Sequence, residues 1–317
     1  MRLTDSRALT RVRQFLWGTW RQGSSMRRQL VGRYGYLVLL IIIILAVDLY
    51  PFFDALRLSF FAKNLMNPGG DRFTGMGNFV RLLTKEPLFW PTLWNTIVFT
   101  IGSVVFEYLI GLGSALLLTS RFIPMKNLFK ALVLLPWAVP IAINSLIWKF
   151  MLAPNYGFIN QILDRLGAHD FLQMNWLGDL SLVMPVVIGV NVWRSFPFYA
   201  ITLMAGLATI PKELYESAQV DGASWPARFW HITMPGIKNV SMVVVVLHLI
   251  WTFTNFDVIY LLTGGGPLHA SEVLPTLLYQ QAFELFDMGY ASAIGLFILI
   301  FLVVTVGPLY FRANAKT

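Results

Sequence analysis

The sequence predicts an all-α membrane protein with six transmembrane helices, and three observations support this prediction. Of its 317 residues, 56% are hydrophobic and only 13% are charged, whereas about 25% of the residues in a typical soluble domain are charged. Six separate stretches are apolar over the thickness of a bilayer, and the basic residues concentrate in alternate connections between them. Such a chain needs lipid around much of its surface, so we expect a multi-pass membrane protein.

Each spanning segment needs about 20 apolar residues, because the hydrocarbon core is about 30 Å thick and a helix rises about 1.5 Å per residue. The segments should be helices, because a bilayer offers no water to unpaired backbone groups. A β-barrel would show short segments of alternating polarity instead. The six predicted spans cover residues 36–53, 93–118, 128–152, 180–207, 240–262 and 291–311.

The first three spans differ in how they are interrupted. The first contains an unbroken aliphatic run over 39–47. The second carries Glu107 at mid-membrane depth, where we expect it to pair with another helix. Pro136 and Pro140 interrupt the third span, and such breaks are tolerated where a neighbouring helix or a water-lined cavity recovers the lost hydrogen bonds. We therefore expect a kinked third helix.

The last three spans are predicted from different patterns. Pro185 and Pro197 lie in the fourth span and should kink it. The fifth span is the most polar, with several hydrogen-bonding side chains near its end. Polar groups at membrane depth usually face a cavity or a partner helix, so this end of the span is a candidate functional region. The sixth span is apolar throughout 291–311.

Basic residues indicate the orientation of the spans, because Lys and Arg are enriched in cytoplasmic segments. If both termini are cytoplasmic, 16 of the 24 basic residues lie in inside segments, seven lie outside and Arg194 lies within the fourth span. We therefore predict a basic cytoplasmic arm over 1–34, a six-helix domain over 35–311 and a cytoplasmic tail over 312–317. The net charge of +8 then reflects topology in a lipid bilayer, and no nucleic-acid partner is expected.

The composition excludes several kinds of chemistry in this chain. It has no cysteine, so disulfides, thiolate metal sites and cysteine nucleophiles are impossible. Its four histidines lack metal-ligand spacing, and it contains no G-x-x-x-x-G-K-[ST] phosphate-binding loop. The spans show no clustered set of acid, base and metal ligands. We therefore expect a non-catalytic chain with no metal and no cofactor of its own.

The polar segment 211–235, between the fourth and fifth spans, has the signals of two short helices joined by a turn. Pro211 suits the start of a helix. Gly222 suits a helix C-terminus, because positive φ costs little only for glycine, and Ser224 is a typical N-cap for the second helix. Pro235 should end that helix. The apolar side chains that we expect to contact a partner protein are Leu214, Val220, Phe229 and Ile232.

The same segment contains a motif of known type. The pattern Glu216-x-Ala218-x-x-Asp221-Gly222-Ala223, followed by Ile232 and Pro235, resembles the EAA loop of ABC importer permeases. The Asp-Gly-Ala form is similar to that of the sugar-type permeases, the relatives of the maltose-transporter membrane subunits. Ser217 and Met234 replace the usual Ala and Leu. The resemblance covers about 35–311, and the other similar segments are 77–79, 156–160, 193–197 and 262–267.

This resemblance implies a fold, a set of partners and a mechanism. The fold would be that of type I ABC importer permeases, and the EAA loop would dock on a cytoplasmic ABC ATPase dimer that binds ATP and Mg²⁺. The other partners would be a second permease subunit, by family habit a different chain, and an extracytoplasmic solute-binding protein. ATP binding would drive alternating access across the bacterial cytoplasmic membrane. The residues implied in ATPase coupling are Glu216, Ala218, Asp221, Gly222 and Ala223.

The resemblance also implies a substrate site in the fifth span. Sugars need hydrogen-bonding groups together with aromatic faces, and helical spacing places four candidates of the fifth span on one stripe. In the fourth span, the fork of Arg194 suits a carboxylate, sulfonate or phosphate. Arg194 could equally pair with Asp257, Glu107 or a carbonyl. The alternative for all these polar groups is hydrogen bonding between helices. The candidate substrate contacts are Asn191, Arg194, Trp251, Thr254, Asn255, Asp257 and Val258, of which Trp251, Thr254, Asn255 and Val258 form the stripe.

The predicted function is therefore a permease subunit that translocates a sugar or sugar-derived solute, either neutral or anionic. Three alternatives belong to other classes. An ion-coupled secondary transporter would usually show an internal repeat and acidic residues at broken helices. An intramembrane enzyme would need a clustered catalytic set, and a structural assembly subunit would bind partners without moving solute.

Overall fold

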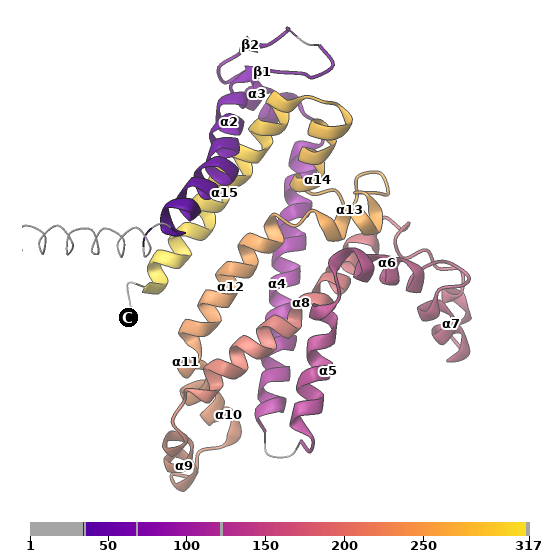
Figure 1. The fold of residues 1–317 in the computed structure, drawn as a ribbon. Coiled ribbons are helices and arrows are strands. Elements are labelled where there is room, and N and C mark those ends of the chain that lie inside the picture. Colours follow the sequence, from indigo (N-terminus) through magenta and orange to yellow (C-terminus); the bar gives the residue numbers. More distant parts are fainter. Residues whose placement is uncertain (1–33, 35, 68, 121–122, 315–317) are drawn as a thin grey trace, which may run out of the picture. The chain divides into compact units, whose positions relative to one another are not determined.

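The computed structural model describes residue 34 and residues 36–67, 69–120 and 123–314, which are mostly helical (Figure 1). The predicted basic arm over 1–34 lies almost wholly outside these residues. The chain divides into two compact units, and the boundary in the sequence falls between Arg57 and Leu58. The described part of the first unit is one apolar helical segment. It starts at Tyr36, includes the π-helical turn η1 (Ile44–Leu49) and continues into α2 (Tyr50–Leu58).

Four helical segments of the described residues are individually long and apolar enough to cross a membrane. Two further pairs of helices pass the same test together but are sharply bent, so the number of spans reaches six if each pair counts as one. The four continuous segments are Tyr36–Leu58, α4 (Phe89–Thr119), α8 (Val183–Ala208) and the Met288–Leu309 part of α15 (Met288–Asn314). These segments match the first, second, fourth and sixth predicted spans to within a few residues.

The third predicted span is broken. It consists of α5 (Lys126–Ala138) and α6 (Ile141–Met151), which meet at an angle of 92°. The break falls at Pro140, because a proline lacks the N–H needed to continue the helix and its ring clashes with the preceding turn. The expected kink is confirmed and is much sharper than a bend. In the fourth span, Pro185 lies in the first turn of α8, where its missing N–H is not needed.

The fifth predicted span is also interrupted. The short helix α11 (Met234–Gly236) precedes α12 (Lys238–Phe253), and α13 (Asp257–Thr263) follows after three non-helical residues. The prediction of one continuous helical stripe through Trp251 and Val258 is therefore wrong. The helix that carries Trp251 ends at Phe253, and α13 packs instead beside α6.

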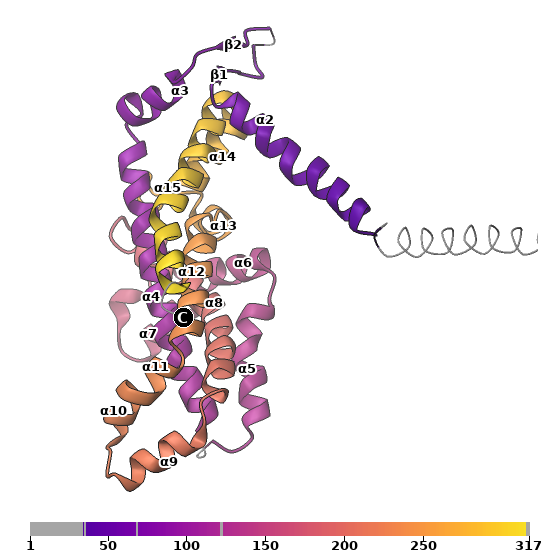
Figure 2. The same cartoon turned by 90° about the vertical axis from the view of Figure 1, so that its left-hand side faces the viewer.

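The centre of the second unit is the pair α4 and α8, which pack along each other, with α12 against α4 (Figures 1 and 2). Gly111 makes this contact possible, because a Cβ atom there would collide with the Cβ atom of Tyr199. The lack of a side chain at Gly111 therefore sets how closely α4 and α8 pack. Three apolar clusters surround the pair; their fully buried members include Phe99 and Val187, Phe89 and Leu274, and Leu203 and Ile237.

Short elements fill the connections. Strands β1 (Phe61–Ala62) and β2 (Arg72–Phe73) pair antiparallel, with Phe61 opposite Phe73. The other elements are α3 (Gly77–Val80), η2 (Arg81–Lys85), α7 (Phe158–Arg165), the 3₁₀ turn η3 (His169–Phe171), α14 (Leu274–Tyr279) and η5 (Gln280–Glu284).

One buried side chain holds the loop between α6 and α8 together. Asn160 is 0% exposed. Its amide donates hydrogen bonds to the carbonyls of Leu172 (3.2 Å) and Met174 (2.9 Å), and its Oδ1 accepts one from the indole of Trp176. One residue therefore fixes three points of a long loop.

Replacing Asn160 by leucine should destabilise this loop, because two carbonyls and one indole N–H lose their partner. We expect a loss of about 2–4 kcal/mol in the free energy of unfolding, since each buried unpaired group costs about 1–3 kcal/mol. Thermal unfolding of the detergent-solubilised protein measures this loss. The exposed neighbour Gln161 is the control, because Gln161→Leu should cost less than about 0.5 kcal/mol. Equal melting temperatures for the two variants would contradict the prediction.

Candidate functional site

A buried carboxylate joins three helices in the centre of the second unit. Glu107 on α4 is 0% exposed. It accepts a hydrogen bond from the Asn191 amide of α8 at 2.9 Å, and its second oxygen lies 2.9 Å from Nδ1 of His248 on α12. Asn255 extends the network by donating to Oδ1 of Asn191 at 3.3 Å. The prediction that Glu107 pairs with another helix is confirmed, and we name these four residues the Glu107 network.

A cavity of about 80 Å³ lies beside the Glu107 network. Two nitrogens of its lining side chains are buried without a hydrogen-bond partner among the described residues: Nε of Arg194 and Nε2 of His248. A buried unpaired polar group costs free energy, so these atoms favour a polar occupant. The cavity is lined by Trp137, Asn191, Arg194, Ser195, His248, Trp251, Thr252 and Asn255.

The structure brings four of the seven predicted substrate contacts to this cavity: Asn191, Arg194, Trp251 and Asn255. The other three lie elsewhere. The Thr254 hydroxyl donates to the carbonyl of Ile250 at 2.9 Å. Asp257 is exposed at the start of α13, and Val258, 1% exposed, belongs to an apolar cluster. The helix break after Phe253 accounts for this division, because it turns the later residues away from the face of Trp251.

Sequence reasoning did not assign four of the lining residues to the site. Two of them had a signal in the sequence. His248 and Thr252 lie four residues apart and therefore share one helix face, and this face borders the cavity. Trp137 and Ser195 had no such signal, because their positions depend on how α5 and α8 pack. For Arg194 the sequence left open a contact with the solute or a pair with Asp257, Glu107 or a carbonyl. Asp257 and Glu107 are its charged neighbours, while its Nε makes no hydrogen bond within the described part of the chain.

The segment 211–235 forms α9 (Lys212–Val220), α10 (Trp225–Arg228), the π-helical turn η4 (Phe229–Thr233) and α11. It lies at the lower end of Figure 1. Gly222 has φ +75°, its N–H bonds to the Gln219 carbonyl (3.1 Å), and the Ala223 N–H bonds to the Ala218 carbonyl (2.8 Å). These two bonds define a Schellman motif, so the predicted place of Gly222 at a helix C-terminus is confirmed. Ser224 occupies the N-cap position without the expected side-chain hydrogen bond.

Most of the predicted coupling residues are accessible. Glu216, Asp221 and Gly222 are exposed, and Ala218 and Ala223 are half-buried beside the turn. The sequence did not indicate the role of Tyr215, whose hydroxyl lies 3.0 Å from the hydroxyl of Thr233 and ties α9 to η4.

The apolar side chains of this segment divide into two groups. Leu214 and Val220 are exposed, at 51% and 89%, as expected for contacts with a partner. Phe229 and Ile232 are half-buried and pack against the chain's own core, which leaves less of each side chain for a partner. The wider turn of a π-helix changes which residues share a face, which explains this difference.

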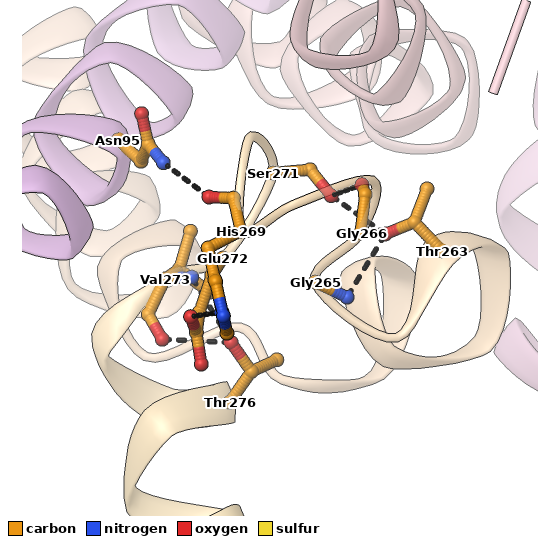
Figure 3. Close-up of polar contacts among 9 residues, drawn as sticks. All are labelled: Asn95, Thr263, Gly265, Gly266, His269, Ser271, Glu272, Val273 and Thr276. Carbon is orange, nitrogen blue, oxygen red and sulfur yellow. Dashed lines mark hydrogen bonds and ion pairs between the residues drawn. The ribbon is translucent and has the colours of Figure 1, made fainter. Parts of the chain in front are cut away.

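The C-terminal end of α13 is followed by a polar loop that leads to α14 (Figure 3). The hydroxyls of Thr263 and Ser271 lie 2.8 Å apart, and Ser271 also donates to the Gly266 carbonyl at 2.6 Å. Asn95 of α4 donates to the His269 carbonyl at 3.2 Å. These bonds hold both ends of the loop and join it to α4.

The same loop contains a buried carboxylate, Glu272, which is 0% exposed and hydrogen-bonded to Nδ1 of His269. Burial raises the pKa of the Glu272 carboxyl, and the hydrogen bond and charge of His269 offset part of this rise. Because the folded-state pKa is raised, Glu272 contributes stability below its ordinary pKa of 4.5 and loses that contribution as the pH rises through the folded-state value.

Replacing Glu272 by glutamine should therefore protect this loop at pH 8, since glutamine keeps the hydrogen-bonding shape without a buried charge. We expect slower hydrogen exchange over 264–273 than in the unchanged protein at pH 8, and a difference that shrinks toward pH 4.5. Glu284→Gln, at an exposed position, should change nothing. Faster exchange in Glu272→Gln at pH 8 would contradict the assigned direction.

The comparison with known families decides the identity of the chain. The family described as "binding-protein-dependent transport system inner membrane component" matches residues 107–312. The chain belongs to this family. It is therefore the non-catalytic membrane permease subunit of an ABC importer, an inner-membrane component that works with an ATPase and a substrate-binding protein.

Individual relatives of this permease agree with that assignment. It is 38% identical over 268 residues to the probable ABC transporter permease protein YurN of Bacillus subtilis, covering 84% of this chain and 90% of that protein. It is 40% identical over 233 residues to the trehalose/maltose transport system permease protein MalF of Thermococcus litoralis, covering 73% and 76%. It is 32% identical over 271 residues to the sulfoquinovosyl glycerol transport system permease protein SmoG of Agrobacterium fabrum, covering 86% of each.

Solved structures support the fold. The permease matches a chain of a bacterial ABC transporter involved in the import of the acidic polysaccharide alginate, with a TM-score of 0.78 and 25% identity. The match covers 94% of this chain and 99% of that one. The predicted type I ABC importer permease fold is thus confirmed.

Proposed function

We propose that this permease moves a sugar or sugar-derived solute through a pore that it forms with a second, different permease subunit. The observation that carries the proposal is the cavity beside the Glu107 network. It combines the indole of Trp251 with the amides of Asn191 and Asn255, and sugars bind through hydrogen-bonding groups and aromatic faces. Relatives named for trehalose and maltose, diacetylchitobiose and sulfoquinovosyl glycerol support the same substrate class.

The proposed substrate carries an anionic group. Arg194 is the cation of the cavity lining, and its guanidinium matches the geometry of a carboxylate or sulfonate. The unpaired Nε of Arg194 and Nε2 of His248 supply polar atoms at the cavity wall. Thr254 and Asp257, exposed around the helix break, contact the solute as it leaves the cavity. Val258 supports this region from the core without a contact in this conformation.

The break in the fifth span fits such a site. Transporters often bind their substrates where helices are discontinuous, because unwound backbone groups then face a cavity. Here Asn255 lies in the non-helical stretch between α12 and α13, and its Oδ1 accepts the Val258 N–H at 3.3 Å. The side chain therefore both borders the cavity and starts the next helix.

The segment 211–235 is proposed to dock on the ATPase dimer, which binds ATP and Mg²⁺, whereas this chain binds neither. Glu216, Asp221, Leu214 and Val220 provide an exposed charged and apolar surface for that contact. Movement of α9 reaches η4 through the Tyr215–Thr233 hydrogen bond, and four residues separate the end of η4 from the start of α12. Since α12 carries His248, this path links the ATPase contact on α9 to the Glu107 network.

The proposed orientation puts both termini and the segment 211–235 in the cytoplasm. The loop in Figure 3 and the loop between α6 and α8 then face outward, where the solute-binding protein docks. The excess of Lys and Arg in the inside segments supports this orientation.

Purification of the tagged chain from mild detergent, with uptake measurements on the reconstituted complex, tests the proposal. We expect a P-loop ATPase and a second permease to copurify, and D-galacturonate, an acidic sugar, to enter proteoliposomes only with ATP and the binding protein. Trehalose and maltose are the neutral comparison, and uptake of these sugars alone would contradict an anionic substrate. Asn255→Ala should reduce uptake about five- to thirtyfold while the complex still copurifies, because a lost substrate hydrogen bond costs about 1–2 kcal/mol. A chain that purifies alone, with uptake that survives ATP depletion, would favour an ion-coupled secondary transporter.

A further inference from the structure

A second and larger cavity lies at the end of α6, beside the loop of Figure 3 and away from α9 (Figure 1). Its volume is about 440 Å³, within the range of about 300–1,000 Å³ that is usual for small-molecule sites. We name it the outer pocket. It is lined by Lys149, Leu152, Ala153, Pro154, Tyr156, Asn175, Leu177, Gly178, Leu262, Thr263, Gly266 and Pro267.

Both walls of the outer pocket are fixed by hydrogen bonds. One wall is the start of the loop in Figure 3, where the Ser271 hydroxyl holds Thr263 and Gly266. The other wall is the loop between α6 and α8, which Asn160 holds at three points. The Oδ1 atom of Asn175 also accepts the Gly178 N–H at 3.0 Å. The pocket is therefore a preorganised surface rather than a gap between loose loops.

The chemistry of the lining points to an anionic, hydroxylated ligand. Lys149 is the cation of the lining, the lining contains no carboxylate, and no ion pair of Lys149 is found among the described residues. The Tyr156 ring is 66% exposed and offers an apolar face with a hydroxyl. The amide nitrogen of Asn175 adds a hydrogen-bond donor. A cation, an aromatic face and an amide are the groups that an acidic sugar needs.

We propose that the outer pocket is a binding site for an acidic monosaccharide unit. It is distinct from the cavity beside the Glu107 network, which we name the central cavity. Lys149 binds the carboxylate or sulfonate, the Tyr156 ring packs against the sugar face and Asn175 donates to a hydroxyl. This inference rests on the proposed function, because it makes the pocket the first site that the transported solute occupies in the permease. At about 440 Å³ it accommodates a sugar in this conformation, whereas the central cavity of about 80 Å³ does not.

The two sites are connected by one short helix. Asn255, at the central cavity, lies just before α13, and Leu262 and Thr263, at the outer pocket, end it. The seven residues of α13 span about 10 Å. A displacement of α13 therefore changes both sites together, which links release from the outer pocket to opening of the central cavity.

The absence of cysteine from the natural chain allows a direct test. A single reporter, Leu177→Cys, lines the pocket without supplying a proposed contact. The purified complex, in nanodiscs of phosphatidylcholine and without the binding protein, is labelled with a membrane-impermeant methanethiosulfonate. We expect D-galacturonate to slow the labelling and D-galactose at the same concentration to have a much weaker effect. The neutral lipid removes anionic headgroups as a competing source of the same chemistry.

Two background substitutions locate the binding. Lys149→Gln should weaken the galacturonate protection about tenfold or more, as expected for loss of a charge-assisted hydrogen bond. The matched control Lys85→Gln, at another exposed lysine on the proposed outer side, should leave the protection unchanged.

Several results would overturn the proposal. They are no protection by galacturonate, equal protection in Lys149→Gln, or equal protection by inorganic phosphate. Normal ATP-driven uptake by the unmodified complex, without galacturonate protection, would reject only the outer pocket. If the unmodified complex takes up no solute, and the ATPase and second permease do not copurify with this chain, the proposed function itself is rejected.

Discussion

Gly222→Val is expected to abolish ATP-driven uptake while the permease still inserts and folds. Gly222 has φ +75° in the turn that follows α9, and a β-branched residue in this conformation is strained by about 1–3 kcal/mol. No atom lies within 4 Å of a Cβ built at this position, so the strain comes from the backbone alone. Its relief moves Asp221 and Ala223, which lie beside the exposed Glu216. Uptake by proteoliposomes, together with copurification of the ATPase, measures the effect.

Gly167 is a matched control for this prediction. It has φ +92° at the end of α7, with no atom within 4 Å of an added Cβ atom. Its N–H bonds to the Asp164 carbonyl and the Ala168 N–H bonds to the Leu163 carbonyl, both at 2.9 Å, which is the same motif as at Gly222. Gly167→Val should therefore cost a similar amount of stability and leave ATPase coupling intact. Equal loss of uptake in both variants would show that backbone strain, and not the coupling segment, is responsible.

Glu107→Ala is expected to have the largest effect on stability of any single change considered. It removes the carboxylate that holds Asn191 and His248, and it leaves their buried polar atoms unpaired. Each such group costs about 1–3 kcal/mol, so we expect the free energy of unfolding to fall by about 3–5 kcal/mol. Because the contact links α4, α8 and α12, the cavity should lose its shape and uptake should fall with it. Thermal unfolding in detergent and uptake after reconstitution measure the two effects.

Glu107→Gln separates hydrogen bonding from charge. The glutamine amide can still accept from Asn191 and donate to Nδ1 of His248, so most of the lost stability should return. If uptake also returns, the carboxylate acts by positioning the cavity residues. If stability returns but uptake does not, the negative charge itself is needed in transport. A Glu107→Ala variant as stable as the unchanged protein would contradict the structural role of the Glu107 network.

The sequence predicts those features of the fold that depend on local composition. Apolar length located the spans, because lipid selects for it directly. The turn at Gly222 was predictable because positive φ selects glycine, and the break at Pro140 because proline cannot continue a helix. In each case one residue type carries the signal, and no distant contact is needed to interpret it.

The rest depends on contacts between distant segments. The break after Phe253 contains neither proline nor glycine, and its form depends on Asn255, which bonds to both Asn191 and Val258. The pairing of Glu107 with His248 joins residues 141 positions apart, and no periodicity encodes such a partner. Val258 was assigned to the substrate stripe because a continuous helix was assumed. The same limit applies to the outer pocket, whose two walls come from separate loops.

The close approach of α4 and α8 at Gly111 has a consequence for how the protein moves. Two helices whose backbones touch over a glycine, with Tyr199 locked above it, behave as a rigid body during alternating access. The more deformable parts are then the helix breaks at Pro140 and after Phe253, which we expect to act as hinges beside the α4–α8 pair. We therefore expect α6 and α13 to move relative to the α4–α8 pair during transport. Spin labels placed on α4 and α8 would keep their separation through the cycle, while labels on α6 and α8 would not.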